Sequence, residues 1–161
     1  MKLPTNNHSQ EGYPCGINMA DVLLVYKKNF EEVHDESLNS LKQVLLDRSD
    51  SIRVEIRARE KVRRADFIGR DLVIVLGGDG TLTSISHNID SHTPVMGVNS
   101  HPRNEQNDGS LGFYMDSSVQ TFAQDIDLAL SGKAIVNLLP RLQATIAVSY
   151  THLTLPTTER V

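Results

Sequence analysis

The chain has 161 residues, of which 39% are hydrophobic and 22% are charged, so it can build the core of one ordinary domain and is not a disordered tail. Its formal net charge of −4 at pH 7 argues against nucleic acid as a partner, because phosphate backbones favour basic surfaces. Cys15 is the only cysteine, which excludes an internal disulfide framework and favours a reducing, cytoplasmic location. No apolar run reaches the length of a signal peptide or a membrane span.

The apolar pattern alternates between strand-like and helix-like segments along the chain. Short apolar or alternating runs predict strands at residues 22–26, 52–56, 72–76, 94–98 and 141–148. Amphipathic spacing predicts helices at residues 31–48, 81–88 and 119–130. The run at 72–76 is wholly aliphatic, as in strands buried on both faces of a parallel sheet. We therefore expect an α/β fold, a three-layer Rossmann-like domain with a parallel sheet between helices.

Polar segments separate these elements. Residues 53–70 are rich in arginine and are interpreted as a solvated connector, although some of the arginines could instead contact a nucleotide phosphate. Residues 99–110 are rich in turn-forming residues and predict an exposed loop. His87, His92 and His101 do not have the spacing of metal ligands, so no metal site is predicted from them.

Five residues that directly follow the aliphatic strand point to chemistry: Gly77-Gly78-Asp79-Gly80-Thr81. Open α/β sheets bind ligands at the carboxyl ends of their strands, glycines let a backbone approach a ligand, and a helix N-terminus attracts phosphate. A carboxylate there, that of Asp79, suits Mg²⁺ binding or proton removal from an attacking hydroxyl. The alternative is an ordinary Asp-Gly turn in which Asp79 caps the helix. The preceding glycines and the buried strand favour a phosphate-handling site.

This glycine motif (residues 77–81) resembles that of NAD kinases, of lipid kinases of the diacylglycerol and sphingosine type, and of phosphofructokinases. Residues 82–87 lack the Asn-Glu-Val segment that is typical of the lipid kinases. The turn Gly97-Val98-Asn99 and then Leu111-Gly112-Phe113 match, in order, motifs of NAD kinases. The series looks closest to the plant and mitochondrial-like branch of that family, except that His101 replaces the usual Asp.

The resemblance implies a kinase that phosphorylates the 2′-hydroxyl of the adenosine ribose of NAD or NADH, with ATP as donor and Mg²⁺ or another divalent metal. It implies that Asp79 is the general base and that Gly80 lies against the substrate. The phosphate loop would be shaped by Gly77, Gly78 and Thr81.

Two positions outside the motif complete the implied site. Asn99 would help to form the pocket, and Phe113 would lie close to the adenosine, unless Phe113 is a plain core aromatic. The resemblance further implies a homo-oligomeric full-length form. The net charge and the lack of a membrane-spanning stretch lead us to expect no nucleic-acid or membrane partner. Two other functions stay open: another kinase of this superfamily that acts on a lipid or a sugar, and a non-catalytic nucleotide-binding module.

The resemblance also predicts how the chain is divided. Residues 1–19 form a loose leader, residues 20–138 the N-terminal kinase domain, and residues 139–148 the start of a β-rich second domain. Residues 149–161 do not resemble the family and look like translated sequencing-adapter read-through. We therefore expect an N-terminal fragment that lacks the family's C-terminal β-sandwich domain and is inactive alone.

Overall fold

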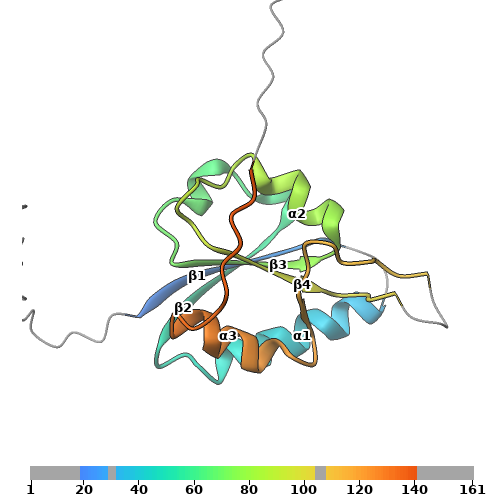
Figure 1. Cartoon of the computed structure of the whole chain (residues 1–161). Coiled ribbons are helices and arrows are strands. Elements are labelled where there is room, and N and C mark those ends of the chain that lie inside the picture. Colours follow the sequence, from blue (N-terminus) through green and yellow to red (C-terminus); the bar gives the residue numbers. More distant parts are fainter. Residues whose placement is uncertain (1–18, 29–31, 104–107, 141–161) are drawn as a thin grey trace, which may run out of the picture.

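The computed structural model describes residues 19–28, 32–103 and 108–140, and these form a parallel sheet with helices on both faces (Figure 1). The strand order is β2-β1-β3-β4-β5. The strands are β1 (Ala20–Tyr26), β2 (Ile52–Ala58), β3 (Leu72–Gly77), β4 (Val95–Asn99) and β5 (Ser117–Ser118). Helices α1 (Glu32–Leu46) and α3 (Phe122–Leu130) cover one face, and α2 (Asp79–Ser86) covers the other. The predicted three-layer α/β architecture is confirmed.

The core is split by the sheet into two apolar layers. Side chains alternate between the faces of a strand, so successive residues of β1 enter opposite layers. Leu24 belongs to the cluster that contains Leu41 of α1, and all of these side chains are buried. Val25 belongs to the cluster that contains Ile85 of α2. This two-sided burial explains the uninterrupted aliphatic run of β3, which is buried at every residue.

The element boundaries largely follow the prediction, with three differences. Helix α2 begins at Asp79, two residues before the expected start, so that Asp79 lies in the helix. The connector after β2 contains two 3₁₀ turns, η1 (Arg59–Lys61) and η2 (Arg64–Phe67). Strand β5 was not predicted, because its two serines have no apolar pattern. The predicted leader and the predicted strand at 141–148 lie outside the described residues, apart from Met19.

None of the helices in the described residues has the length and apolar composition needed to span a bilayer.

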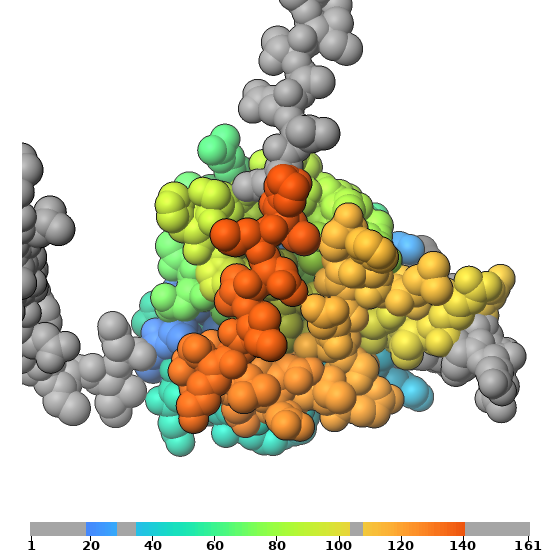
Figure 2. All heavy atoms as spheres, in the orientation of Figure 1, coloured from blue at the N-terminus to red at the C-terminus, as the bar shows by residue number. Residues whose placement is uncertain are grey.

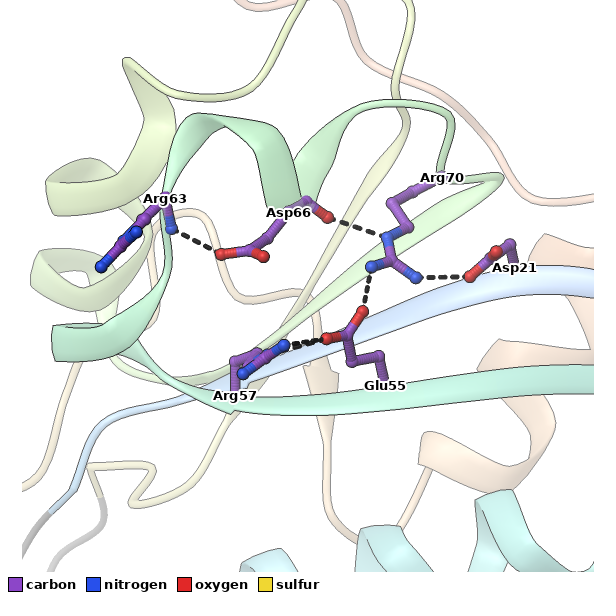
Figure 3. A network of polar contacts seen from close by, with 6 residues as sticks. All are labelled: Asp21, Glu55, Arg57, Arg63, Asp66 and Arg70. Atoms are coloured by element: carbon purple, nitrogen blue, oxygen red, sulfur yellow. Dashed lines mark hydrogen bonds and ion pairs between the residues drawn. The ribbon is translucent and has the colours of Figure 1, made fainter.

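An ion-pair network holds the amino-terminal half of the sheet (Figure 3). The Arg70 guanidinium, only 13% exposed, donates to Asp21 Oδ1 at 2.5 Å, to Glu55 Oε2 and to the Asp66 carbonyl at 2.8 Å. It thereby connects the segment before β3 to both β1 and β2. Arg57 adds a more exposed contact to Glu55. The hypothesis that the arginine-rich stretch meets a phosphate is therefore wrong for Arg70, which lies at the opposite end of the sheet from the glycine motif.

We predict that Arg70→Met lowers the free energy of unfolding by about 2–3 kcal/mol, because the Asp21 carboxylate loses its ion-pair partner and Glu55 keeps only the more exposed contact with Arg57. Arg57→Met is the matched control and should cost less than about 1 kcal/mol, since the Arg57 side chain is 46% exposed. Urea denaturation followed by circular dichroism measures both values. Equal losses in the two variants would contradict this assignment.

The same network gives the prediction a pH dependence. Hydrogen bonds from Arg70, and then from Arg57, hold the pKa of Glu55 below its ordinary value of 4.5. A lowered folded-state pKa contributes stability that is present above pH 4.5 and is lost as the pH falls through the folded value. The stability difference between the wild-type chain and Arg70→Met should therefore narrow in acid.

Candidate functional site

The candidate site lies where β3 and β4 end. Gly77, the last residue of β3, pairs in register with Asn99, the last residue of β4. The backbone N–H of Ser100 then donates to the Gly77 carbonyl at 3.1 Å and extends the pairing past the strand ends. The strand order reverses next to β3, because the chain passes from β1 outward to β2 and then returns to the other side of β1. The carboxyl ends of strands at such a reversal are where sheets of this kind bind ligands.

The glycine motif turns tightly from β3 into α2. Gly78 is the N-cap residue of α2, and its carbonyl accepts the backbone N–H of Thr81 at 2.8 Å. A Cβ on Gly77 would lie 2.5 Å from Thr81 Oγ1, so Gly77 leaves room for the buried Thr81 side chain. Nothing lies within 4 Å of a Cβ added at Gly80, which is exposed. The motif is therefore closely packed at Gly77 and open at Gly80.

The Asp79 carboxylate does not cap its own helix. Asp79 Oδ2 accepts the backbone N–H of Phe113 at 2.9 Å, and Asp79 Oδ1 accepts that of Tyr114 at 2.8 Å. No side-chain capping hydrogen bond is found at the N-terminus of α2. The alternative in which Asp79 only caps the helix is therefore wrong, and its carboxylate instead joins α2 to the segment between β4 and β5.

That segment includes residues 110–114, which we call the aromatic turn. Gly112 has φ +67°, a left-handed conformation that favours glycine, and its N–H donates to Ser110 Oγ at 3.2 Å. The Met115 N–H donates back to the Gly112 carbonyl at 3.1 Å. This tight reversal directs the N–H groups of Phe113 and Tyr114 at Asp79.

Asn99 fixes both ends of the segment that leads from β4 to the aromatic turn. Its buried side chain donates through Nδ2 to the Ser110 carbonyl at 3.2 Å and accepts the His101 N–H on Oδ1 at 3.1 Å. The prediction that residues 99–110 form an exposed loop is wrong at its start, since Asn99 and Ser100 are 5% and 9% exposed. Their polar groups can be buried because they are hydrogen-bonded.

The two aromatic residues of the turn are on the surface. The Phe113 side chain is 80% exposed and Tyr114 is 39% exposed, and their rings meet edge to face with centroids 5.1 Å apart. The alternative of Phe113 as a core aromatic is therefore wrong. An exposed aromatic pair beside a hydrogen-bonded carboxylate can stack on a planar ligand while the carboxylate contacts a polar group of that ligand.

The predicted site residues thus come together, with the glycine motif, Asn99 and Phe113 around one end of the sheet. The sequence interpretation missed the contacts of Ser110 with this site, although the residue directly precedes the Leu111-Gly112-Phe113 motif. It also missed the steric role of Gly97, where a Cβ would lie 2.5 Å from both the Tyr114 carbonyl and Met115 Sδ. Nothing in the local pattern signalled these contacts between distant segments.

The family described as ATP-NAD kinase N-terminal domain matches residues 19–134. The chain belongs to this family. The match includes every predicted site residue, and the described helices and strands lie within it.

Several curated relatives are named NAD kinase or NADH kinase. An NADH kinase of Arabidopsis thaliana is 38% identical over 82 residues, which are 45% of this chain and 26% of that protein. A probable NADH kinase of Oryza sativa subsp. japonica is 36% identical over 140 residues, 78% of this chain and 39% of that protein. An NAD kinase of Thiobacillus denitrificans is 30% identical over 111 residues, 63% of this chain and 36% of that protein. The two plant relatives agree with the predicted branch, and the chain spans less than half the length of each relative.

We predict that Gly112→Ala destabilises the kinase-family domain by more than Gly132→Ala. Both glycines have positive φ, which costs a substituted alanine about 1–2 kcal/mol. Only at Gly112 does the new Cβ also meet another group, Asn99 Nδ2 at 2.6 Å, whereas Gly132 faces open space. Urea denaturation of the two variants measures the difference. Equal losses would show that the turn accommodates the methyl group.

Proposed function

We propose that the protein carrying this domain is an NAD kinase, which transfers the γ-phosphoryl group of ATP to the 2′-hydroxyl of the adenosine ribose of NAD or NADH. The observation that carries the proposal is the contact between Asp79 and the aromatic turn. The proposal is supported because this contact joins the carboxylate that follows β3 to the backbone of two residues with exposed aromatic rings. The family match and the names of the relatives favour NAD over a lipid or sugar acceptor.

In this proposal Asp79 is the catalytic residue that takes the proton of the ribose hydroxyl as the oxygen attacks phosphorus. Each of its carboxylate oxygens accepts one backbone N–H, and a carboxylate oxygen can accept a further hydrogen bond. The substrate hydroxyl can therefore bind Asp79 while the aromatic turn stays attached. Such positioning, together with proton removal, is what phosphoryl transfer to an alcohol requires of a protein.

The remaining predicted residues would surround that reaction. Gly77, Gly78 and Thr81 would shape the loop that approaches phosphate at the start of α2. Gly80 would face the substrate across the open space beside its Cα. Asn99 would hold the segment that leads to the aromatic turn, and Phe113 would stack on the adenine.

A divalent metal would enter this site with the phosphates of the nucleotide. The described residues contain no group of three His, Cys, Asp or Glu side chains that could hold a metal. Mg²⁺ commonly binds substrate phosphates and water with one or two carboxylates, and Asp79 is the carboxylate that lies at the site. When bound, the ion would neutralise charge on the transferring phosphoryl group.

The proposal also covers the partners, the oligomeric form and the location of the protein. We propose NAD(H) and ATP as the small-molecule partners, no nucleic-acid or membrane partner, and a homo-oligomeric full-length form. A cytoplasmic location is supported by a sequence with a single cysteine, Cys15. Light scattering of the product of the complete gene would measure the oligomeric state.

We predict that Asp79→Asn, made in the product of the complete gene, lowers kcat for NADP formation by on the order of 10²–10⁴-fold, the usual contribution of a general base. The KM for NAD should rise as well, because the new NH₂ group faces one of the two backbone N–H donors. A coupled NADP assay measures both constants. NAD, diacylglycerol and fructose 6-phosphate are each offered as acceptor, so that a lipid or sugar kinase would be recognised.

Asp90→Asn is the matched control for this change. Asp90 also accepts two backbone N–H groups in a turn, those of His92 and Thr93 at 2.9 Å, but beyond the other end of α2. It should leave kcat and the KM for NAD unchanged. If Asp79→Asn keeps full turnover, or if the two variants lose activity equally, Asp79 is not the base.

We predict that Gly80→Ala separates function from stability. The new methyl group meets no atom within 4 Å, and alanine stabilises a helix over glycine by roughly 0.5–1 kcal/mol. The variant should therefore unfold at a higher urea concentration but have a higher KM for NAD, since the methyl group occupies the space proposed for the substrate. Ser84→Ala, at an exposed position further along α2, serves as control. An unchanged KM in Gly80→Ala would refute contact between Gly80 and the substrate.

A further inference from the structure

The aromatic turn has three consecutive backbone N–H groups, and side-chain oxygens accept all of them. The Gly112 N–H donates to Ser110 Oγ at 3.2 Å. The next two, from Phe113 and Tyr114, donate to the two oxygens of Asp79 at 2.9 and 2.8 Å. Ser110 therefore binds the first of these three N–H groups, and Asp79 binds the other two.

These contacts matter because few apolar groups hold the turn. Leu111 and Phe113 are 79% and 80% exposed, so they contribute little burial. In Figure 2 the segment that contains the turn lies on the surface, beside the chain that follows α3. Apart from the edge-to-face contact with Tyr114, the turn that carries the Phe113 ring depends on hydrogen bonds rather than on apolar burial.

Ser110 itself is held in place on several sides. Its N–H donates to the His101 carbonyl at 2.8 Å, and its carbonyl accepts the Arg103 N–H at 3.0 Å and Asn99 Nδ2 at 3.2 Å. Its hydroxyl also lies close above the glycine motif, since a Cβ on Gly78 would be 2.9 Å from Ser110 Oγ. The hydroxyl is therefore a fixed point between the glycine motif and the aromatic turn.

We infer that Ser110 is a positioning residue for the acceptor nucleotide. Its hydroxyl holds Gly112 in the conformation that presents Phe113 to the adenine and the following N–H groups to Asp79. This inference rests on the proposed function, to which it adds a residue that acts on NAD binding alone. If loss of the hydroxyl lowers the fraction of molecules with an ordered turn, the apparent affinity for NAD falls by the same factor. In this inference ATP does not contact the turn, so the affinity for ATP should not change.

The test is Ser110→Ala in the product of the complete gene. The KM for NAD should rise roughly 3- to 10-fold, as for loss of one neutral hydrogen bond, while kcat and the KM for ATP stay within about twofold. Ser110→Thr keeps the hydroxyl oxygen and should restore the KM for NAD. Hydrogen exchange of the Gly112, Phe113 and Tyr114 amides, measured by NMR without ligand, should accelerate in the alanine variant and return towards normal in the threonine variant.

Ser118→Ala is the matched control. Ser118 Oγ likewise accepts a backbone N–H, that of Thr121 at 3.3 Å, but it lies before α3. The control should change neither the KM for NAD nor exchange in the aromatic turn. An unchanged KM in Ser110→Ala, or an equal rise in the KM for ATP, would overturn the inference. If the protein forms no NADP at all, the proposed function fails, and unchanged amide exchange in Ser110→Ala would then refute the positioning role independently.

Discussion

Two hydrogen bonds, from the backbone N–H groups of Phe113 and Tyr114 to the carboxylate of Asp79, join segments that are 34 and 35 positions apart in the chain. The two N–H groups have no partner in a strand or helix, and the carboxylate accepts both of them. The carboxylate orders the aromatic turn, and the turn orients the carboxylate. The candidate base and the aromatic surface beside it therefore form one unit rather than two adjacent features.

Close backbone approach makes this unit possible, and glycine makes the approach possible. A Cβ at Gly97 would lie 2.5 Å from the Tyr114 carbonyl, and one at Gly112 would lie 2.6 Å from Asn99 Nδ2. These distances are shorter than any ordinary contact, so the segments could not take these positions with larger residues. Strand pairing fixes the position of Gly97, which pairs with Val75 of β3. The geometry of the site thus derives from strand register, with side chains excluded where backbones must meet.

Sequence reasoning predicted the sheet, its helices and the place of the site because these follow from local patterns. The aliphatic run of β3 and the glycines after it can be recognised from the local sequence alone. The hydrogen-bond partners of Asp79 could not be predicted, because they depend on where the turn with a positive φ at Gly112 brings two N–H groups. The hydrogen bond from Asn99 to Ser110 could not be predicted either, because it also joins residues that are distant in the sequence. Pairing between β4 and β5 was also unreadable, because Ser117 and Ser118 have no strand-like pattern.

The two ends of the sheet have different roles. The amino ends carry a stabilising ion-pair network, and the carboxyl ends carry the candidate site. At the amino ends, Arg70 joins Asp21 and Glu55, so charged side chains hold three adjacent segments together away from the site. At the carboxyl ends, Gly80 faces open space and the aromatic turn is exposed. The exposed turn contributes little apolar burial of its own to stability. It can keep its geometry only if the strands beneath it are rigid, so the buried aliphatic core and the Arg70 network are what allow Asp79 to be held by two backbone amides alone.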